Sequence, residues 1–155
     1  MWISSINASG IFFPSDLCEK MISPEIIKIA SDTSNYGIKK NSELVVTSKN
    51  KICGDKITVE IEISNNKIVK MYYETESCIF CQASASLLSK VVEKSNIQNL
   101  QNDIAEISMT HKNKKIVLKR RYKPFRKLFQ LKYKQRYSCI LLPFNALLKV
   151  VNSTI

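Results

Sequence analysis

Hydrophobic and polar residues alternate along three neighbouring stretches in the first half of the chain. The clearest is ITVEIEIS at 57–64, where every second position is aliphatic, as in a strand with one buried face. SELVVTS at 42–48 and KIVKMYYET at 67–75 are interpreted as the other two strands, with Asn65-Asn66 as the turn. Such short links favour an antiparallel meander with one covered face.

Four further stretches have the composition or spacing of helices that would cover this sheet. SPE at 23–25 supplies an N-cap, a proline at the first helical position and an acid in the first turn. The other three helices are expected at 79–94, 97–107 and 138–151. The sequence therefore predicts an α+β fold, a three-stranded antiparallel sheet covered on one face by helices.

The composition suits one domain. The chain has 155 residues, of which 45% are hydrophobic and 24% charged. Residues 1–20 show neither the alternation of a strand nor the spacing of an amphipathic helix. We therefore expect a loosely structured N-terminal extension followed by a domain at 21–155. No stretch approaches the roughly 20 apolar residues of a membrane span, and the start of the chain lacks a signal-peptide pattern. We expect a cytoplasmic protein that does not contact a membrane.

Positive charge is concentrated in the last third of the chain. The net charge is +11, and all 13 acidic residues lie at or before Glu106, whereas residues 112–136 hold 12 Lys or Arg and no acid. We interpret about 110–136 as a basic helical insertion. Such a segment attracts an acidic protein surface, nucleic acid or an anionic membrane, and its charge alone does not choose among them.

Aromatic residues within this basic segment support two interpretations. Rings among cations are typical of a module that binds single-stranded nucleic acid. The leucines that accompany the rings instead favour a helix whose aromatic side is buried, which makes nucleic acid the less favoured partner. The residues concerned are Tyr122, Phe125, Phe129, Tyr133 and Tyr137, with Leu118, Leu128 and Leu131.

Three cysteines and one aspartate form the most promising chemical group. Cys53 and Asp55 lie in the link before the second predicted strand, and Cys78 lies in the link after the third. In a meander these two links fall at the same end of the hairpin, and Cys139 begins the last predicted helix. Three thiols and a carboxylate make a four-ligand set for a metal ion.

Two of these cysteines are predicted to have a lowered thiol pKa, because each lies at the N-terminus of a helix. Cys78 and Cys139 each stand where a helix begins, and unpaired N–H groups there lower the pKa of a thiol. Arg136 adds positive charge near the second of them. A thiolate is the form that both metal binding and sulfur transfer require.

Other reactive side chains carry weaker signals. Cys81 forms a Cys-x-x-Cys spacing with Cys78, but its neighbours indicate a buried helical residue, and Cys18 lies in the extension. His111 is the only histidine and is interpreted as a solvated loop residue. With three glycines in the whole chain, a glycine-rich phosphate loop is absent from the sequence.

Three segments carry a resemblance: NKICGDKITVEIEI at 50–63, SCIFCQASASLL at 77–88 and RYSCILLPFNAL at 136–147. They are similar to the Asn-Pro-x-Cys-Gly-Asp, Gly-Cys-x-x-x-x-Ala-Ser-Ala-Ser and Arg-x-x-Cys-x-x-Leu-Pro-Trp-x-Ala-Leu patterns of the NifU/IscU-type iron–sulfur cluster assembly scaffolds. Within that family the chain resembles the SufU-like branch. The likeness runs from about Tyr36 to Val151.

This resemblance implies a scaffold protein, not an enzyme. It implies that Cys53, Asp55, Cys78 and Cys139 bind Zn²⁺ or Fe and hold a transient [2Fe–2S] cluster. It also implies that Cys53 or Cys139 accepts persulfide sulfur from a cysteine desulfurase, that Arg136 helps to bind the partner, and that apo iron–sulfur proteins receive the cluster. A zinc-bound sulfur relay that assembles no cluster is the alternative within the same fold.

The chain also departs from the family patterns. Lys51 replaces the proline of the first motif, and Ser77 replaces the glycine before Cys78. Ser138 stands where the IscU branch has histidine, and Phe144 replaces the tryptophan after Leu-Pro. None of these changes removes a predicted ligand.

Overall fold

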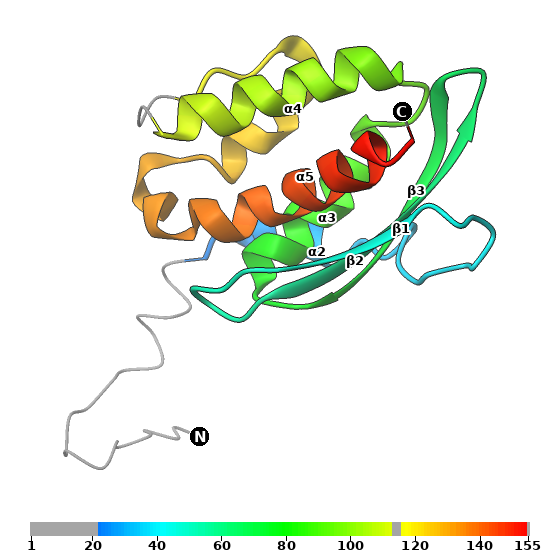
Figure 1. The fold of residues 1–155 in the computed structure, drawn as a ribbon. Coiled ribbons are helices and arrows are strands. Elements are labelled where there is room, and N and C mark those ends of the chain that lie inside the picture. Colours follow the sequence, from blue (N-terminus) through cyan, green and yellow to red (C-terminus); the bar gives the residue numbers. More distant parts are fainter. Residues whose placement is uncertain (1–21, 113–115, 155) are drawn as a thin grey trace.

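The computed structural model describes residues 22–112 and 116–154, with only the backbone described at 110–112 (Figure 1). The predicted N-terminal extension at 1–20, including Cys18, lies outside the described residues. No helix in the described part of the chain is both long enough and apolar enough to cross a membrane.

The alternating stretches form a three-stranded antiparallel sheet. The strands are β1 (Val45–Lys49), β2 (Lys56–Ser64) and β3 (Lys67–Glu76), in the spatial order β1-β2-β3. Asn65 and Asn66 join β2 to β3 with φ angles of 51° and 60°, the left-handed conformation of a tight hairpin turn that asparagine tolerates. The predicted meander is confirmed.

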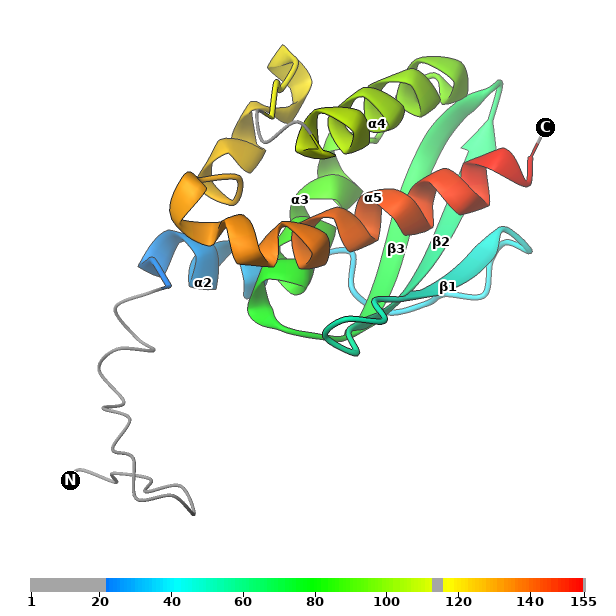
Figure 2. The ribbon, with the colours of Figure 1, turned by 60° about the vertical axis from the view of Figure 1, so that its left-hand side comes forward.

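Helices cover one face of the sheet, as Figure 2 shows. Ser23 caps the first of them, with its Oγ accepting a hydrogen bond from the backbone N–H of Ile26 at 3.4 Å. The predicted α+β fold is therefore confirmed. The helical elements are α2 (Pro24–Ala30), α3 (Ile79–Val91), α4 (Ile97–Lys112), α5 (Tyr137–Asn152) and the 3₁₀ helices η1 (Arg120–Lys127) and η2 (Leu131–Arg136).

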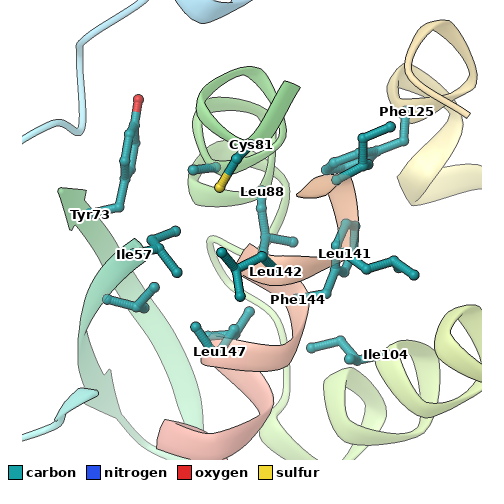
Figure 3. Close-up of a cluster of buried hydrophobic side chains, with 14 of the residues drawn as sticks. Ile57, Tyr73, Cys81, Leu88, Ile104, Phe125, Leu141, Leu142, Phe144 and Leu147 are labelled. Carbon is teal, nitrogen blue, oxygen red and sulfur yellow. The ribbon is translucent and has the colours of Figure 1, made fainter. Parts of the chain in front are cut away.

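Helix α5 lies at the centre of the core, in contact with α3, α4, β1 and β2 (Figure 3). Small residues let α3 approach it closely, and the buried Ser84 hydroxyl donates to the carbonyl of Ile140 at 2.6 Å. On another side of α5 the ring of Phe144 packs on Phe125, with centroids 4.9 Å apart. This packing fixes the start of α5, which carries Cys139, relative to α3.

The outer face of the sheet differs from the prediction at Glu60. The alternation places Glu60 among the solvated residues of the strand, yet it is fully buried. Its carboxylate accepts four backbone N–H groups of residues 39–42, at 2.7–3.1 Å. Burial alone would raise the pKa of Glu60, but these four hydrogen bonds outweigh it and lower the pKa. The carboxylate thus anchors a loop over this face.

The basic segment is built from 3₁₀ turns, unlike the amphipathic helix that the sequence suggests. Its aromatic side is buried as expected, with Tyr122 and Phe125 fully inaccessible and Tyr133 at 4% exposure. Rings in this position are unavailable for stacking on bases. The preceding helix α4 continues through His111, so the prediction of a loop there is wrong, and the imidazole itself lies outside the described residues.

Candidate metal centre

The loop between β1 and β2 is shaped by Asn50, a residue to which the sequence patterns assign no role. Its backbone N–H donates to the carbonyl of Asp55 at 2.7 Å, and its carbonyl accepts the N–H of Gly54 at 2.8 Å. Its Oδ1 also accepts the N–H of Ile52 at 3.0 Å. Asparagine before a Gly-containing turn is the available sequence signal. Gly54 has a φ of 74°, which other residues adopt only with strain.

This loop brings Cys53 and Asp55 to the first turn of α5. The Sγ atoms of Cys53 and Cys139 lie 3.4 Å apart, although 86 residues separate them in sequence. One ligand atom from each of Cys53, Asp55 and Cys139 falls within 4.8 Å of the others. Two thiolates on one tetrahedral zinc ion lie about 3.8 Å apart, because each Zn–S bond is about 2.3 Å. The spacing would allow the three side chains to bind one ion with little movement.

Asp55 is held in an orientation that leaves one oxygen without a partner. The side chain is 7% exposed, and its Oδ1 accepts the backbone N–H of Cys78 at 3.2 Å. Its Oδ2 is buried and has no hydrogen-bond partner among the described residues. A buried carboxylate oxygen of this kind is costly in isolation but suits a cation. The donor set therefore fits a metal ion.

Cys78 lies at the edge of this group. It is the N-cap of α3 and half-buried, and its sulfur does not belong to the set of ligand atoms within 4.8 Å. It remains beside the group through the hydrogen bond from its backbone N–H to Asp55. The structure thus gathers three of the four predicted ligands closely and holds the fourth next to them.

Burial reverses the predicted effect of the helix N-termini on the thiols. Desolvation raises the pKa of Cys78, the N–H groups of α3 lower it only in part, and the Asp55 carboxylate raises it. Burial likewise raises the pKa of Cys139, and the neighbouring Cys53 thiol adds to the effect. The prediction of activated thiols is therefore wrong for the metal-free site, because desolvation exceeds the helix effect.

Cys81 belongs to the core and not to the site. Its side chain is fully buried and points from α3 into the interior (Figure 3). Burial raises the pKa of this thiol to about 12. Such a protonated, inaccessible thiol behaves as a small hydrophobic side chain, as the sequence suggests.

Exposed residues surround Cys53 on the solvent side of the site. Cys53 is exposed, whereas Cys139 is only 2% exposed. Ile52, next to Cys53, is 88% exposed and extends an apolar side chain from the loop. Arg136 is also exposed and directly precedes α5, three positions before Cys139. An approaching protein meets an apolar residue and a cation around one accessible thiol.

Comparison with known proteins identifies the family of the chain. A family model described as the NifU-like N-terminal domain matches residues 21–121, more than half of the chain. The match includes Cys53, Asp55 and Cys78, and Cys139 lies beyond it. No curated protein sequence matches the chain.

Solved structures share the fold at low sequence identity. A NifU-like protein (N-terminal) from Brucella abortus superposes with a TM-score of 0.76 at 19% identity, covering 90% of this chain and 99% of its own. A protein from Fervidobacterium islandicum, described as a candidate iron–sulfur cluster assembly scaffold for the SUF system, gives a TM-score of 0.73 at 22% identity. That match covers 86% of this chain and 98% of the Fervidobacterium chain. These likenesses support the fold described above.

Proposed function

The chain belongs to the NifU-like N-terminal domain family, and from this membership we propose that it is a scaffold on which iron–sulfur clusters are assembled. The observation that carries the proposal is the group of Cys53, Asp55 and Cys139, with ligand atoms within 4.8 Å and the Asp55 Oδ2 buried without a partner. In this proposal Cys78 completes the set by rotating its side chain toward the group. Zn²⁺ or Fe and then a transient [2Fe–2S] cluster are the cargo.

The difference in solvent exposure between Cys53 and Cys139 favours one of them as the sulfur acceptor. Both Cys53 and Cys139 belong to the group, but only Cys53 is open to a partner protein. We propose that the Cys53 thiolate attacks the outer sulfur of a persulfide on a cysteine desulfurase. An S–S bond forms on Cys53 as the bond in the desulfurase breaks, and the desulfurase cysteine leaves as a thiolate. No external oxidant or reductant is required.

The surroundings of Cys53 suit such an encounter. Ile52 provides an exposed apolar contact, and Arg136 provides a charge near the start of α5. We propose that Arg136 binds the desulfurase and that apo iron–sulfur proteins later receive the cluster at the same face. Three thiolates with a carboxylate hold a cluster less firmly than four thiolates, which suits a cargo that must leave.

A zinc-bound sulfur relay is the second function, and the donor set favours it. Three thiolates and one carboxylate fill the tetrahedral shell of zinc without an open position. Such a protein would accept sulfur on a cysteine but would remain colourless when supplied with iron. Visible absorption after anaerobic incubation therefore distinguishes the two functions.

Metal and sulfur measurements on cysteine variants test the proposal. Wild-type protein should hold about one zinc or iron per chain. After anaerobic incubation with ferrous iron, cysteine and a desulfurase it should gain the visible absorption of a [2Fe–2S] cluster. Cys53→Ser, Cys78→Ser and Cys139→Ser should each lose most of the metal. Cys53→Ser should also fail to gain the 32 Da of one sulfur atom that mass spectrometry detects on the wild type.

Cys81→Ala is the matched control, because its thiol lies outside the proposed ligand set. It should retain the metal content of the wild type. Arg136→Ala should retain metal as well but take up sulfur more slowly. Full metal content in Cys53→Ser and Cys139→Ser, or equal loss in Cys81→Ala, would contradict the proposed site.

A further inference from the structure

The 3₁₀ helix η1 buries every third residue. Tyr122, Phe125 and Leu128, the last just past its end, are all fully buried, whereas every residue between them is exposed. A 3₁₀ helix has three residues per turn, so side chains three positions apart lie in one row. The segment from Arg120 to Leu128 therefore has three distinct rows, and the first of them belongs to the core.

The second row attaches the segment to the rest of the domain. Arg121 donates from its Nη1 to the Oγ of the buried Ser95 at 2.6 Å. Lys127 forms an ion pair with Glu25, with its Nζ 3.4 Å from the Oε2 atom. The position between these two cations in the row is Pro124. Both cations of this row thus have structural partners.

The third row consists of Arg120, Lys123 and Arg126. All three are exposed, and none forms a hydrogen bond or an ion pair with another described residue. With a rise of about 2.0 Å per residue, their positions repeat about every 6 Å along the helix. Arg120, Lys123 and Arg126 therefore form a row of three unpaired cations along η1. The first row is held by the core, and the second is held by the partners of Arg121 and Lys127.

We propose that this cation row docks an acidic α-helix of a partner protein. Carboxylates at positions i, i+4 and i+8 of an α-helix also repeat about every 6 Å on one face, so each meets one cation of the row. No acidic residue follows Glu106 in the chain, so the segment cannot neutralise its own row. This docking surface shares no residue with the candidate metal centre, and its test does not depend on metal or sulfur chemistry.

The same observations disfavour the other anionic partners. Single-stranded nucleic acid is bound by exposed rings among cations, but Tyr122 and Phe125 are fully buried. A membrane-surface helix needs an apolar side free to enter the lipid, and here that side is already packed in the core. A protein helix needs only the fixed charges.

Two synthetic helical peptides of identical composition test the docking geometry. One carries Glu at i, i+4 and i+8, and its isomer distributes the same residues around the helix. Fluorescence anisotropy with the full chain at low ionic strength should show the first peptide binding at least about tenfold more tightly. Replacing Arg120, Lys123 and Arg126 together with Gln should weaken its binding about tenfold or more, because each exposed pair contributes modestly.

The matched control replaces Lys40, Lys67 and Lys94 with Gln, three exposed cations outside the segment. Both triple variants lower the net charge from +11 by three, to +8. The control should bind the first peptide like the wild type, and circular dichroism should show both variants folded. Equal binding of the two peptides, or equal loss in the two variants, would overturn the proposal. The proposal would also be overturned if the wild-type protein bound oligo(dT) or phosphatidylserine vesicles through this row more tightly than it binds the first peptide.

Discussion

Replacing Asp55 with Asn should make the metal-free protein more stable, although the change damages the proposed site. The Oδ2 of Asp55 is buried without a partner, so the fold bears the cost of a desolvated carboxylate oxygen. Asparagine keeps an oxygen at the Oδ1 position to accept the N–H of Cys78 and removes the negative charge. The variant therefore keeps the loop contact and replaces a buried charged oxygen with a neutral amide nitrogen.

The expected gain follows from the larger cost of burying an unpartnered charged oxygen than a neutral amide. That cost is about 1–3 kcal/mol. For a domain of this length, 1 kcal/mol corresponds to about 4 °C in the midpoint of thermal unfolding. The midpoint of Asp55→Asn in the presence of a chelator should therefore exceed that of the wild type by about 4–12 °C.

Metal should reverse this order. Zinc at about 100 times its dissociation constant stabilises the wild type by about 2.7 kcal/mol, whereas a variant that has lost one ligand gains much less. Scanning calorimetry with chelator and then with excess zinc measures both effects on the same samples. The two proteins should exchange rank between the two conditions.

Asp103→Asn is the control for a carboxylate with partners. Its Oδ1 accepts from Lys119 at 2.6 Å and its Oδ2 accepts from the hydroxyl of Tyr122 at 3.3 Å. The same substitution there should lower the midpoint with or without zinc. If Asp55→Asn also lowered the metal-free midpoint, the reasoning from the unpartnered oxygen would be refuted.

Three further predictions concern buried residues. Glu60→Gln should cost about 1–3 kcal/mol at neutral pH, because an amide nitrogen would face backbone donors. Because the folded-state pKa of Glu60 is lowered from 4.5, the difference in urea midpoint between the variant and the wild type should shrink as pH falls below 4.5 toward that lower value. Phe144→Trp, which restores the residue of the family pattern, should destabilise by about 1–3 kcal/mol in urea unfolding, because the site is fully buried among rings. Cys81→Ala should cost on the order of 1 kcal/mol and leave zinc content unchanged by elemental analysis.

The fold was largely predictable because its signals are local. The period of two in β2, the Asn65-Asn66 turn and the Ser23 cap each act over a few residues, and the structure confirms them. The burial of Glu60 was not predictable in this way. It depends on a loop that lies about 20 positions earlier in the chain and folds over the outer face of the sheet.

The proximity of Cys53, Asp55 and Cys139 was predictable, whereas the electrostatics of the candidate site were not. Strand order brings the links that carry Cys53 and Cys78 to one end of the hairpin, which explains why Cys78 lies beside Asp55. The close pair of thiols, Cys53 and Cys139, depends instead on the packing of α5. The pKa of Cys139 depends on how deeply α5 is buried, and sequence does not give that depth. The basic segment shows the same limit. Its burial repeats every three residues, as in a 3₁₀ helix, and this pattern depends on the packing of Tyr122 and Phe125 in the core.

Several unusual features coincide at the candidate site. Glu60, the other buried charged side chain among the described residues, has both carboxylate oxygens hydrogen-bonded. Around the loop at 50–55 three features occur together: Asp55 has an unpartnered oxygen, Ile52 is 88% exposed, and the thiols of Cys53 and Cys139 lie 3.4 Å apart without a disulfide bond. Folding alone does not require any of these features, and in the proposed function each one would become favourable on binding of a cation and a partner protein. We therefore infer that the loop at 50–55 is less stable without metal than it would be with the proposed ion bound.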